Sequence, residues 1–123
     1  MASLSDNVRD NGLQTLTDNV NAIHICSQEP TTFTEATSNY SLGSKSTPTI
    51  GAPQPGDSSG RKVEAAAFSD GTVNSNGIAT HYAWVDTINS ILYVAKLLDG
   101  SQAVTNGNSF GLDAHDVTIP EVS

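Results

Sequence analysis

Apolar residues near the start of the chain recur at helical spacing. Steps of three, four or five residues separate five of them: Leu4, Val8, Leu13, Leu16 and Val20. This stripe predicts a helix over residues 3–21. Ser3 and Asp6 have the spacing of a capping box, with Asp in place of the usual Glu. Gly12 lies inside the pattern and weakens the helix by about 1 kcal/mol relative to alanine.

A short alternating segment follows the helix. Residues 22–26 predict a strand, with Ile23 and Ile25 on one face and His24 and Cys26 on the other. The segment from 27 to 60 has little periodicity and holds four of the five prolines. Within it, residues 35–40 predict one helical turn and residues 42–60 predict a long polar loop. Loops of that length are often functional.

We interpret the polar loop as an extended arm that contacts a neighbouring molecule. Prolines limit the entropy that such a segment loses when it becomes ordered. The arm residues singled out for contacts are Thr47, Pro48, Ile50, Pro53 and Pro55.

The second half of the chain predicts several short strands separated by turns. The expected strands span residues 61–68, 78–85, 91–98 and 117–119. The expected turns are at residues 69–71, 86–90, 99–100 and 106–108, where Gly, Asp and Asn gather. This spacing is typical of a small antiparallel β-sandwich or barrel, so we expect a mainly β fold with a short N-terminal helix.

Alternation over residues 78–85 also predicts part of the core. Ile78, Tyr82 and Trp84 share one face of the expected strand, and Leu92 on the next strand is assigned to the core with them. A buried Trp84 needs a hydrogen-bond partner for its indole N–H.

The size and charge of the chain exclude several function classes. At 123 residues, the chain predicts a single domain, divided into the helix (1–21), a strand plus arm (22–60) and a β-core (61–123). The net charge is −8 with only five Lys and Arg residues, which disfavours nucleic acid and anionic membranes as partners. The chain has no apolar run of membrane-spanning length and no signal-peptide pattern. Its single cysteine excludes an intrachain disulfide.

The residues that could carry chemistry do not form a recognisable set. His24, His81 and His115 lie on separate expected strands and lack metal-ligand spacing, so we expect no metal site. Cys26 next to His24 lacks a third group to orient the histidine, and a lone cysteine among apolar strand residues is more often buried. We therefore predict no catalytic residues, no cofactor and no enzymatic activity.

Several strings of residues resemble a family of small tailed-bacteriophage virion proteins of the head-decoration or cement type. They are ICSQEPTTFTEAT at 25–37, GRKV at 60–63, ATHYA at 79–83, SQAVTNGNSF at 101–110 and DVTIP at 116–120. The resemblance implies a protein without catalytic residues or cofactor that binds the outside of a capsid.

The implied partners are the major capsid protein and further copies of this chain. A homotrimer at three-fold positions is the form that capsid symmetry favours, with a dimer and a monomer as open alternatives. The implied location is the capsid surface of the virion, after synthesis in the host cytoplasm. Two alternatives stay open: a tail or neck component of the virion, and a small β-sandwich module that binds a peptide or a sugar.

Overall fold

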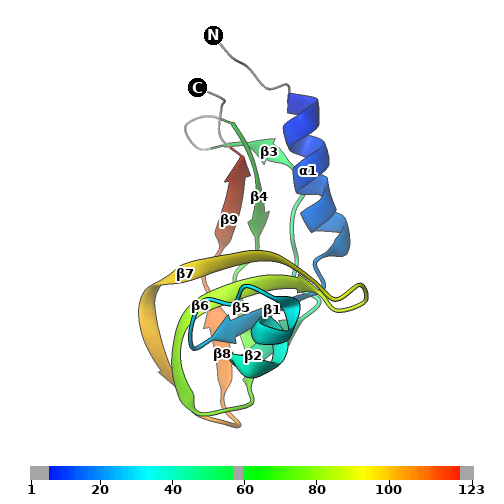
Figure 1. The fold of residues 1–123 in the computed structure, drawn as a ribbon. Helices are drawn as coiled ribbons and strands as arrows, with labels where there is room; N and C mark the ends of the chain where they lie inside the picture. Colours follow the sequence, from blue (N-terminus) through cyan, green and yellow to red (C-terminus); the bar gives the residue numbers. More distant parts are fainter. Residues whose placement is uncertain (1–5, 57–59, 120–123) are drawn as a thin grey trace.

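A curled six-stranded antiparallel sheet forms a half-barrel, and a helix and a smaller sheet lie at one end of it (Figure 1). The structure is a computed structural model that describes residues 6–56 and 60–119. The six-stranded sheet has the order β7-β6-β1-β2-β5-β8, and the three-stranded sheet has the order β3-β4-β9. The predicted mainly β fold with an N-terminal helix is confirmed.

The helices are α1 (Asp6–Asn19) and the single turn η1 (Glu35–Asn39). The strands of the half-barrel are β1 (Ala22–Cys26), β2 (Ser41–Ser46), β5 (Phe68–Val73), β6 (Gly77–Asp86), β7 (Ile91–Val104) and β8 (Ser109–Leu112). The smaller sheet consists of β3 (Gln54–Pro55), β4 (Arg61–Ala65) and β9 (His115–Ile119).

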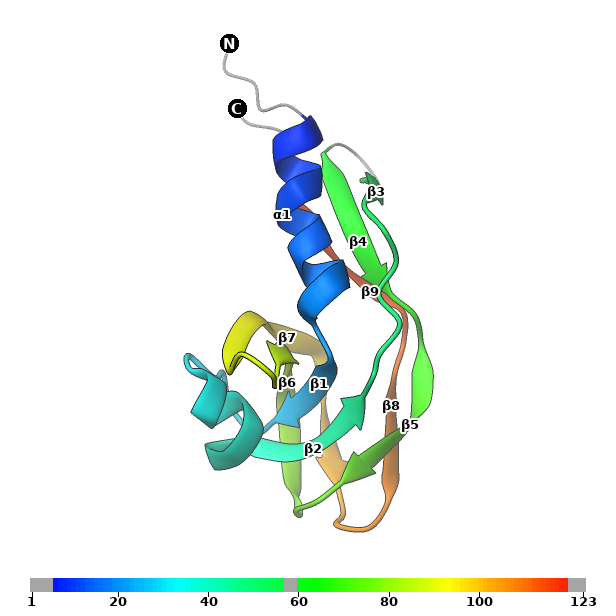
Figure 2. The ribbon, with the colours of Figure 1, turned by 90° about the vertical axis from the view of Figure 1, so that its right-hand side faces the viewer.

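Helix α1 lies along the smaller sheet (Figure 2). Its apolar residues Leu13 and Leu16 are buried in one cluster with Val63 and Ala65 of β4. The predicted helical stripe is therefore confirmed for this part of the helix. Ser3 and Leu4, which were expected to begin the helix, lie outside the described residues.

Strand β1 occupies the middle of the half-barrel and is buried on both faces. It pairs with β2 on one side and with β6 on the other. Ile23 and Ile25 pack into the two clusters of the interior, and Cys26 packs with Ala36 of η1 on the opposite face. The predicted alternation of this strand is confirmed, and so is the helical turn at residues 35–40.

The long polar loop expected over residues 42–60 is wrong in its first part. Residues 41–46 form strand β2, which lies between β1 and β5 and buries Leu42. Gly43 is required there, because a Cβ at this position would lie only 2.3 Å from the carbonyl oxygen of Thr72. Serine and glycine at such close-packed strand positions resemble loop composition in the sequence.

Two long strands form a ribbon that passes through both sheets. In the smaller sheet Ala65 lies opposite His115, and in the half-barrel Phe68 lies opposite Leu112, three residues further along each strand. The register is thus unchanged where β4 gives way to β5 and β8 gives way to β9. The turn predicted at residues 69–71 is wrong, because these residues belong to β5.

Strand β7 contains a large bulge of several residues. Its Gln102 pairs with Ala79 and its Leu97 pairs with His81, so four residues of β7 lie opposite a single residue of β6. The hairpin turn predicted at Asp99-Gly100 is wrong, since both residues lie inside this bulge. The turns expected at 86–90 and 106–108 are confirmed.

The bulge also explains an error in the predicted core. Tyr82 and Trp84 are buried as expected, and Leu92 is half-buried against the cluster around Val85. Ile78 is 57% exposed, and its neighbour Ala79 is buried instead. A register shift between Ala79 and His81 puts this end of β6 out of phase with the rest, so its side chains face the opposite way.

Candidate functional site

The two edge strands of the half-barrel, β7 and β8, leave a pocket of about 320 Å³ between them. We call it the edge pocket. Its apolar lining comes from six side chains of the half-barrel interior: Ile25, Ala79, Leu98, Val104, Phe110 and Leu112. Its polar lining includes Lys96, Asp99, Gln102, Asp113 and His115. The pocket combines an apolar floor with a few polar groups, which is the usual composition of a binding site.

The pocket exists because the barrel does not close. The bulge carries residues 98–101 of β7 away from β6, and β8 ends after four residues, where the chain continues to β9. Every residue from 96 to 100 and from 110 to 115 lines the pocket. If only one face of each strand bordered it, alternate residues would do so. The free main-chain edges of both strands therefore border the pocket.

The rings of Tyr82, Trp84 and His115 pack together, and Tyr82 and His115 also line the pocket. The indole Nε1 of Trp84 donates a hydrogen bond to Nε2 of His115 at 3.0 Å. The other ring nitrogen of His115, Nδ1, lies 2.9 Å from the carbonyl oxygen of Asp113. Since Nε2 accepts, Nδ1 carries the proton and donates to that carbonyl, so this geometry needs a neutral imidazole. The partner that Trp84 was predicted to need is thus His115.

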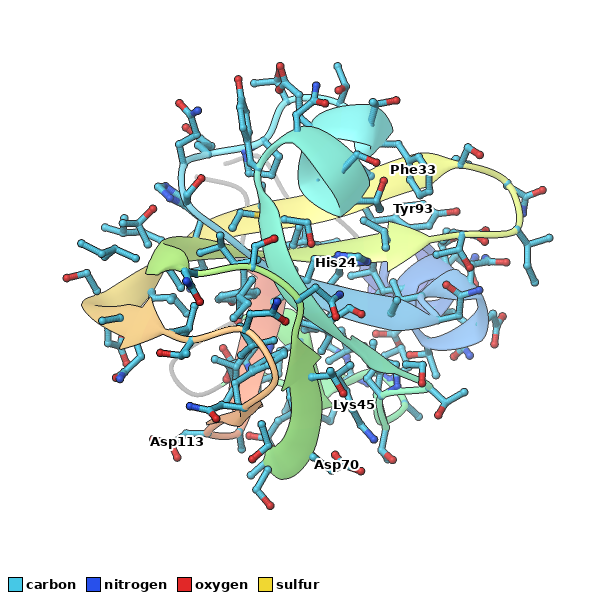
Figure 3. All side chains as sticks on the ribbon, turned by 90° about the horizontal axis from the view of Figure 1, so that it is seen from below. His24, Phe33, Lys45, Asp70, Tyr93 and Asp113 are labelled. Atoms are coloured by element: carbon cyan, nitrogen blue, oxygen red, sulfur yellow. The ribbon has the colours of Figure 1, made fainter. Side chains whose placement is uncertain are left out.

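Tyr82 packs against the same histidine, and the pKa of its hydroxyl depends on the charges around the pocket. Its ring centroid lies 4.5 Å from that of His115. Burial, together with the negative charges of Asp116 and Asp99, raises the pKa of the Tyr82 hydroxyl to about 12. Asp99 and Asp113 are exposed, and Figure 3 shows Asp113 at the outer edge of the molecule. The surroundings of the pocket are therefore electronegative.

Cys26 is a buried core residue, as its sequence context predicted. Burial raises the pKa of its thiol to about 12, so the thiol stays protonated at neutral pH. A protonated thiol is a poor nucleophile. Its Sγ lies 3.6 Å from the carbonyl oxygen of Ala36, to which it donates.

The three histidines lie on three different strands, although β6, which carries His81, pairs directly with β1, which carries His24. His24, in the middle of the sheet in Figure 3, has its Nδ1 2.8 Å from the hydroxyl of Ser41. His81 lies on β6, where its Nδ1 is 2.8 Å from Oγ1 of Thr80, and His115 begins β9. No cluster of three or more His, Cys, Asp or Glu side chains suited to a metal ion occurs within residues 6–56 and 60–119.

The structure places the predicted contact arm along β4. Ile50 forms an isolated bridge with Ala65 and packs on the core, and the amide of Gly51 donates to the carbonyl oxygen of Glu64 at 2.9 Å. Pro48 and Pro53 are half-buried, whereas Thr47 and Pro55 are exposed. The segment from Ile50 to Pro55 runs beside β4. Their contact with another subunit stays a prediction.

Sequence reasoning missed the edge pocket. Its residues come from β1, β6, β7, β8, the start of β9 and the link between β8 and β9, and they meet only because the sheet curls. The bulge at Asp99-Gly100 was visible in the sequence only as a turn signal.

No family model matches the chain, and no curated protein or solved structure shows significant similarity to it. In the described part of the chain, no helix is both long and apolar enough to span a membrane.

Proposed function

We propose that this chain is a structural protein of a phage virion, which binds the outside of the head and holds neighbouring major capsid subunits together. The sequence strings that resemble head-decoration proteins support this proposal. The structural observation that carries it is the position of the exposed large hydrophobic side chains. Among the described side chains there are four, and all lie on β6, β7 or the turn between them: Ile78, Ile88, Ile91 and Leu97.

Exposed apolar groups spread along one hairpin favour docking to another protein. Ile88 is 84% exposed at the tip of the turn, and Leu97 is 63% exposed on an edge strand. Each buried side chain of this size contributes about 1.5–3 kcal/mol when it leaves water. Several small contacts of this kind across different subunits add up to stable attachment through avidity.

The self-association expected of this chain belongs to the same proposal. A homotrimer at capsid three-fold positions brings three β6–β7 hairpins and three arms to one site. In this arrangement the trimer offers the capsid two kinds of contact surface, which are the apolar β6–β7 hairpin and the Pro-rich arm.

Mixing the purified protein with undecorated heads and imaging them by electron microscopy tests the proposal. We expect regular density on the outer surface of the heads. The double variant Ile88→Ser/Leu97→Ser should lower occupancy strongly, whereas Ala67→Ser, which alters an exposed residue outside the hairpin, should decorate heads like the wild type. Wild-type protein that leaves heads bare, or that copurifies with tails, contradicts a head protein.

The edge pocket favours a second candidate function, a module that binds a peptide. A stable protein that ignores phage heads but binds a peptide in the pocket supports this alternative.

A further inference from the structure

We propose that the edge pocket binds an extended, positively charged peptide segment of a partner protein, which adds as a strand to the free edge of β8. This inference goes beyond attachment to a capsid, and it holds for any partner that carries such a segment.

The main chain around the pocket supports strand addition. β8 pairs with β5 on one side and is the last strand of its sheet on the other. The edge of a sheet presents N–H and C=O groups that can pair with another chain. Here those groups border a pocket, because the consecutive β8 residues 110–112 all line it, and residues 113–115, which lead into β9, continue its wall. An added strand satisfies them and extends the half-barrel across its gap.

The side chains around the pocket set the chemistry of that strand. Residues of an added strand alternate between the interior of the half-barrel and the outside. Inward residues meet the apolar floor of Leu98, Val104 and Phe110. Charged groups at the pocket are Asp99 and Asp113, against one cation, Lys96. The fitting segment therefore alternates apolar with positively charged residues.

We expect the positively charged segment to come from a partner protein rather than from this chain. Lys45 pairs with Asp70 at 3.1 Å, Arg61 pairs with Asp10 at 2.8 Å, and Lys62 pairs with Asp116 at 3.2 Å. Three of its five cations therefore already pair with acids of the chain itself. A second copy of this chain is a poor occupant, because a net charge of −8 opposes its approach to an acidic site.

Three fluorescein-labelled heptapeptides provide the test. The first is Val-Arg-Val-Arg-Val-Arg-Val, the second has Glu in place of each Arg, and the third has Pro in place of the central Arg. We expect the first to bind more tightly than the other two in fluorescence anisotropy, since the second reverses the charge and the third removes both a backbone donor and one of the three positive charges. Backbone amide shifts in NMR spectra should move at residues 96–102 and 110–115.

Two protein variants locate the charge effect. Asp99→Asn/Asp113→Asn should weaken binding of the Arg peptide about fivefold, as expected for two exposed ion pairs. Glu29→Gln, which removes an exposed acid from another loop, should leave binding unchanged. Asp99→Lys/Asp113→Lys should reverse the preference and bind the Glu peptide. Equal binding of all three peptides, no binding of the Arg peptide, or amide shifts confined to other strands overturns the proposal, whatever the protein does with phage heads.

Discussion

A hydrogen bond between Trp84 and His115 links β6 of the half-barrel to β9 of the smaller sheet. Trp84 is fully buried on β6, and His115 is the first residue of β9. A buried indole N–H without a partner costs about 1–3 kcal/mol. The bond therefore contributes to stability and also sets the orientation of the histidine at the edge pocket.

Truncating the indole should strongly destabilise the fold. We expect Trp84→Ala to lower the free energy of unfolding by about 3–5 kcal/mol, because it removes a large buried side chain and leaves a cavity. Urea denaturation measures the change. Ile88→Ala, at an exposed position, should change it by less than about 0.5 kcal/mol. A similar small effect for both variants contradicts the burial of Trp84.

The stability of the fold should depend on the protonation of His24. Burial lowers the pKa of this imidazole in the folded state, so the unfolded chain binds the proton more readily. Stability from this source is fully present above the unfolded pKa of about 6.5 and is lost as the pH falls below it. Urea unfolding at pH 7.5 and 5.5 should show a larger loss in the wild type than in His24→Gln. Equal losses contradict this role of His24.

Replacing Gly12 should stabilise the helix. A Cβ at this position meets only Cδ1 of Ile119, at an ordinary contact distance of 3.6 Å. Gly12→Ala should therefore raise the free energy of unfolding by about 1 kcal/mol. A lower melting temperature than that of the wild type contradicts the packing of α1 against β9.

At the scale of single elements, β2 and β7 each contain a glycine that led the sequence pattern to predict a loop or turn where the structure has a strand. Gly43 lies in β2, where the main chain of β5 approaches closely, and Gly100 lies in the bulge of β7. Both resemble loop residues in the sequence. The first is required by a close approach of backbones, whereas the second has open space around it.

Alanine substitutions should separate these two glycines. Gly43→Ala should destabilise the fold, because its Cβ would lie 2.3 Å from a backbone oxygen and the strands must move apart. Gly100→Ala should be neutral or stabilising by up to about 1 kcal/mol, because its surroundings are open and alanine restricts the unfolded chain. Thermal unfolding followed by circular dichroism compares them. A strongly destabilised Gly100→Ala would instead support a tight turn at this position.

For the whole molecule, the ribbon formed by β4–β5 and β8–β9 connects the two sheets. An ion pair holds the two strands of this ribbon together within the smaller sheet, where Lys62 of β4 lies 3.2 Å from Asp116 of β9. The arm crosses the same region, with Thr17 of α1 donating a hydrogen bond of 2.8 Å to the carbonyl oxygen of Gly51. The arm is therefore held on the molecule in a defined path.

Substitutions on the exposed side of the arm test its role on heads. Ala52→Asp/Gln54→Glu adds negative charge at two exposed arm positions and should weaken attachment to an assembled head. The free energy of unfolding should change by less than about 0.5 kcal/mol. Ser75→Asp, which adds a charge at an exposed position far from the arm in sequence, is the control. Full occupancy by the arm variant in electron micrographs shows that the arm is not a contact.

The sequence by itself determined the local elements in which apolar residues recur at regular spacing. The helix around Leu13 and Leu16, the strand at Ala22–Cys26 and the burial of Trp84 all follow from the spacing of apolar residues, because that spacing decides which side chains can leave water together. The acidic balance and the buried character of Cys26 were also evident from composition and context.

Only the tertiary structure decided the features that depend on how distant segments meet. The bulge in β7 exposes Ile78 and buries Ala79, and Ser41–Ser46 becomes a strand because β1 and β5 lie on either side of it. The edge pocket forms for the same reason, since its walls come from strands that only the curl of the sheet brings together. Pairing between strands depends on register and curvature, and these arise from contacts across the whole sheet rather than from any local run of residues.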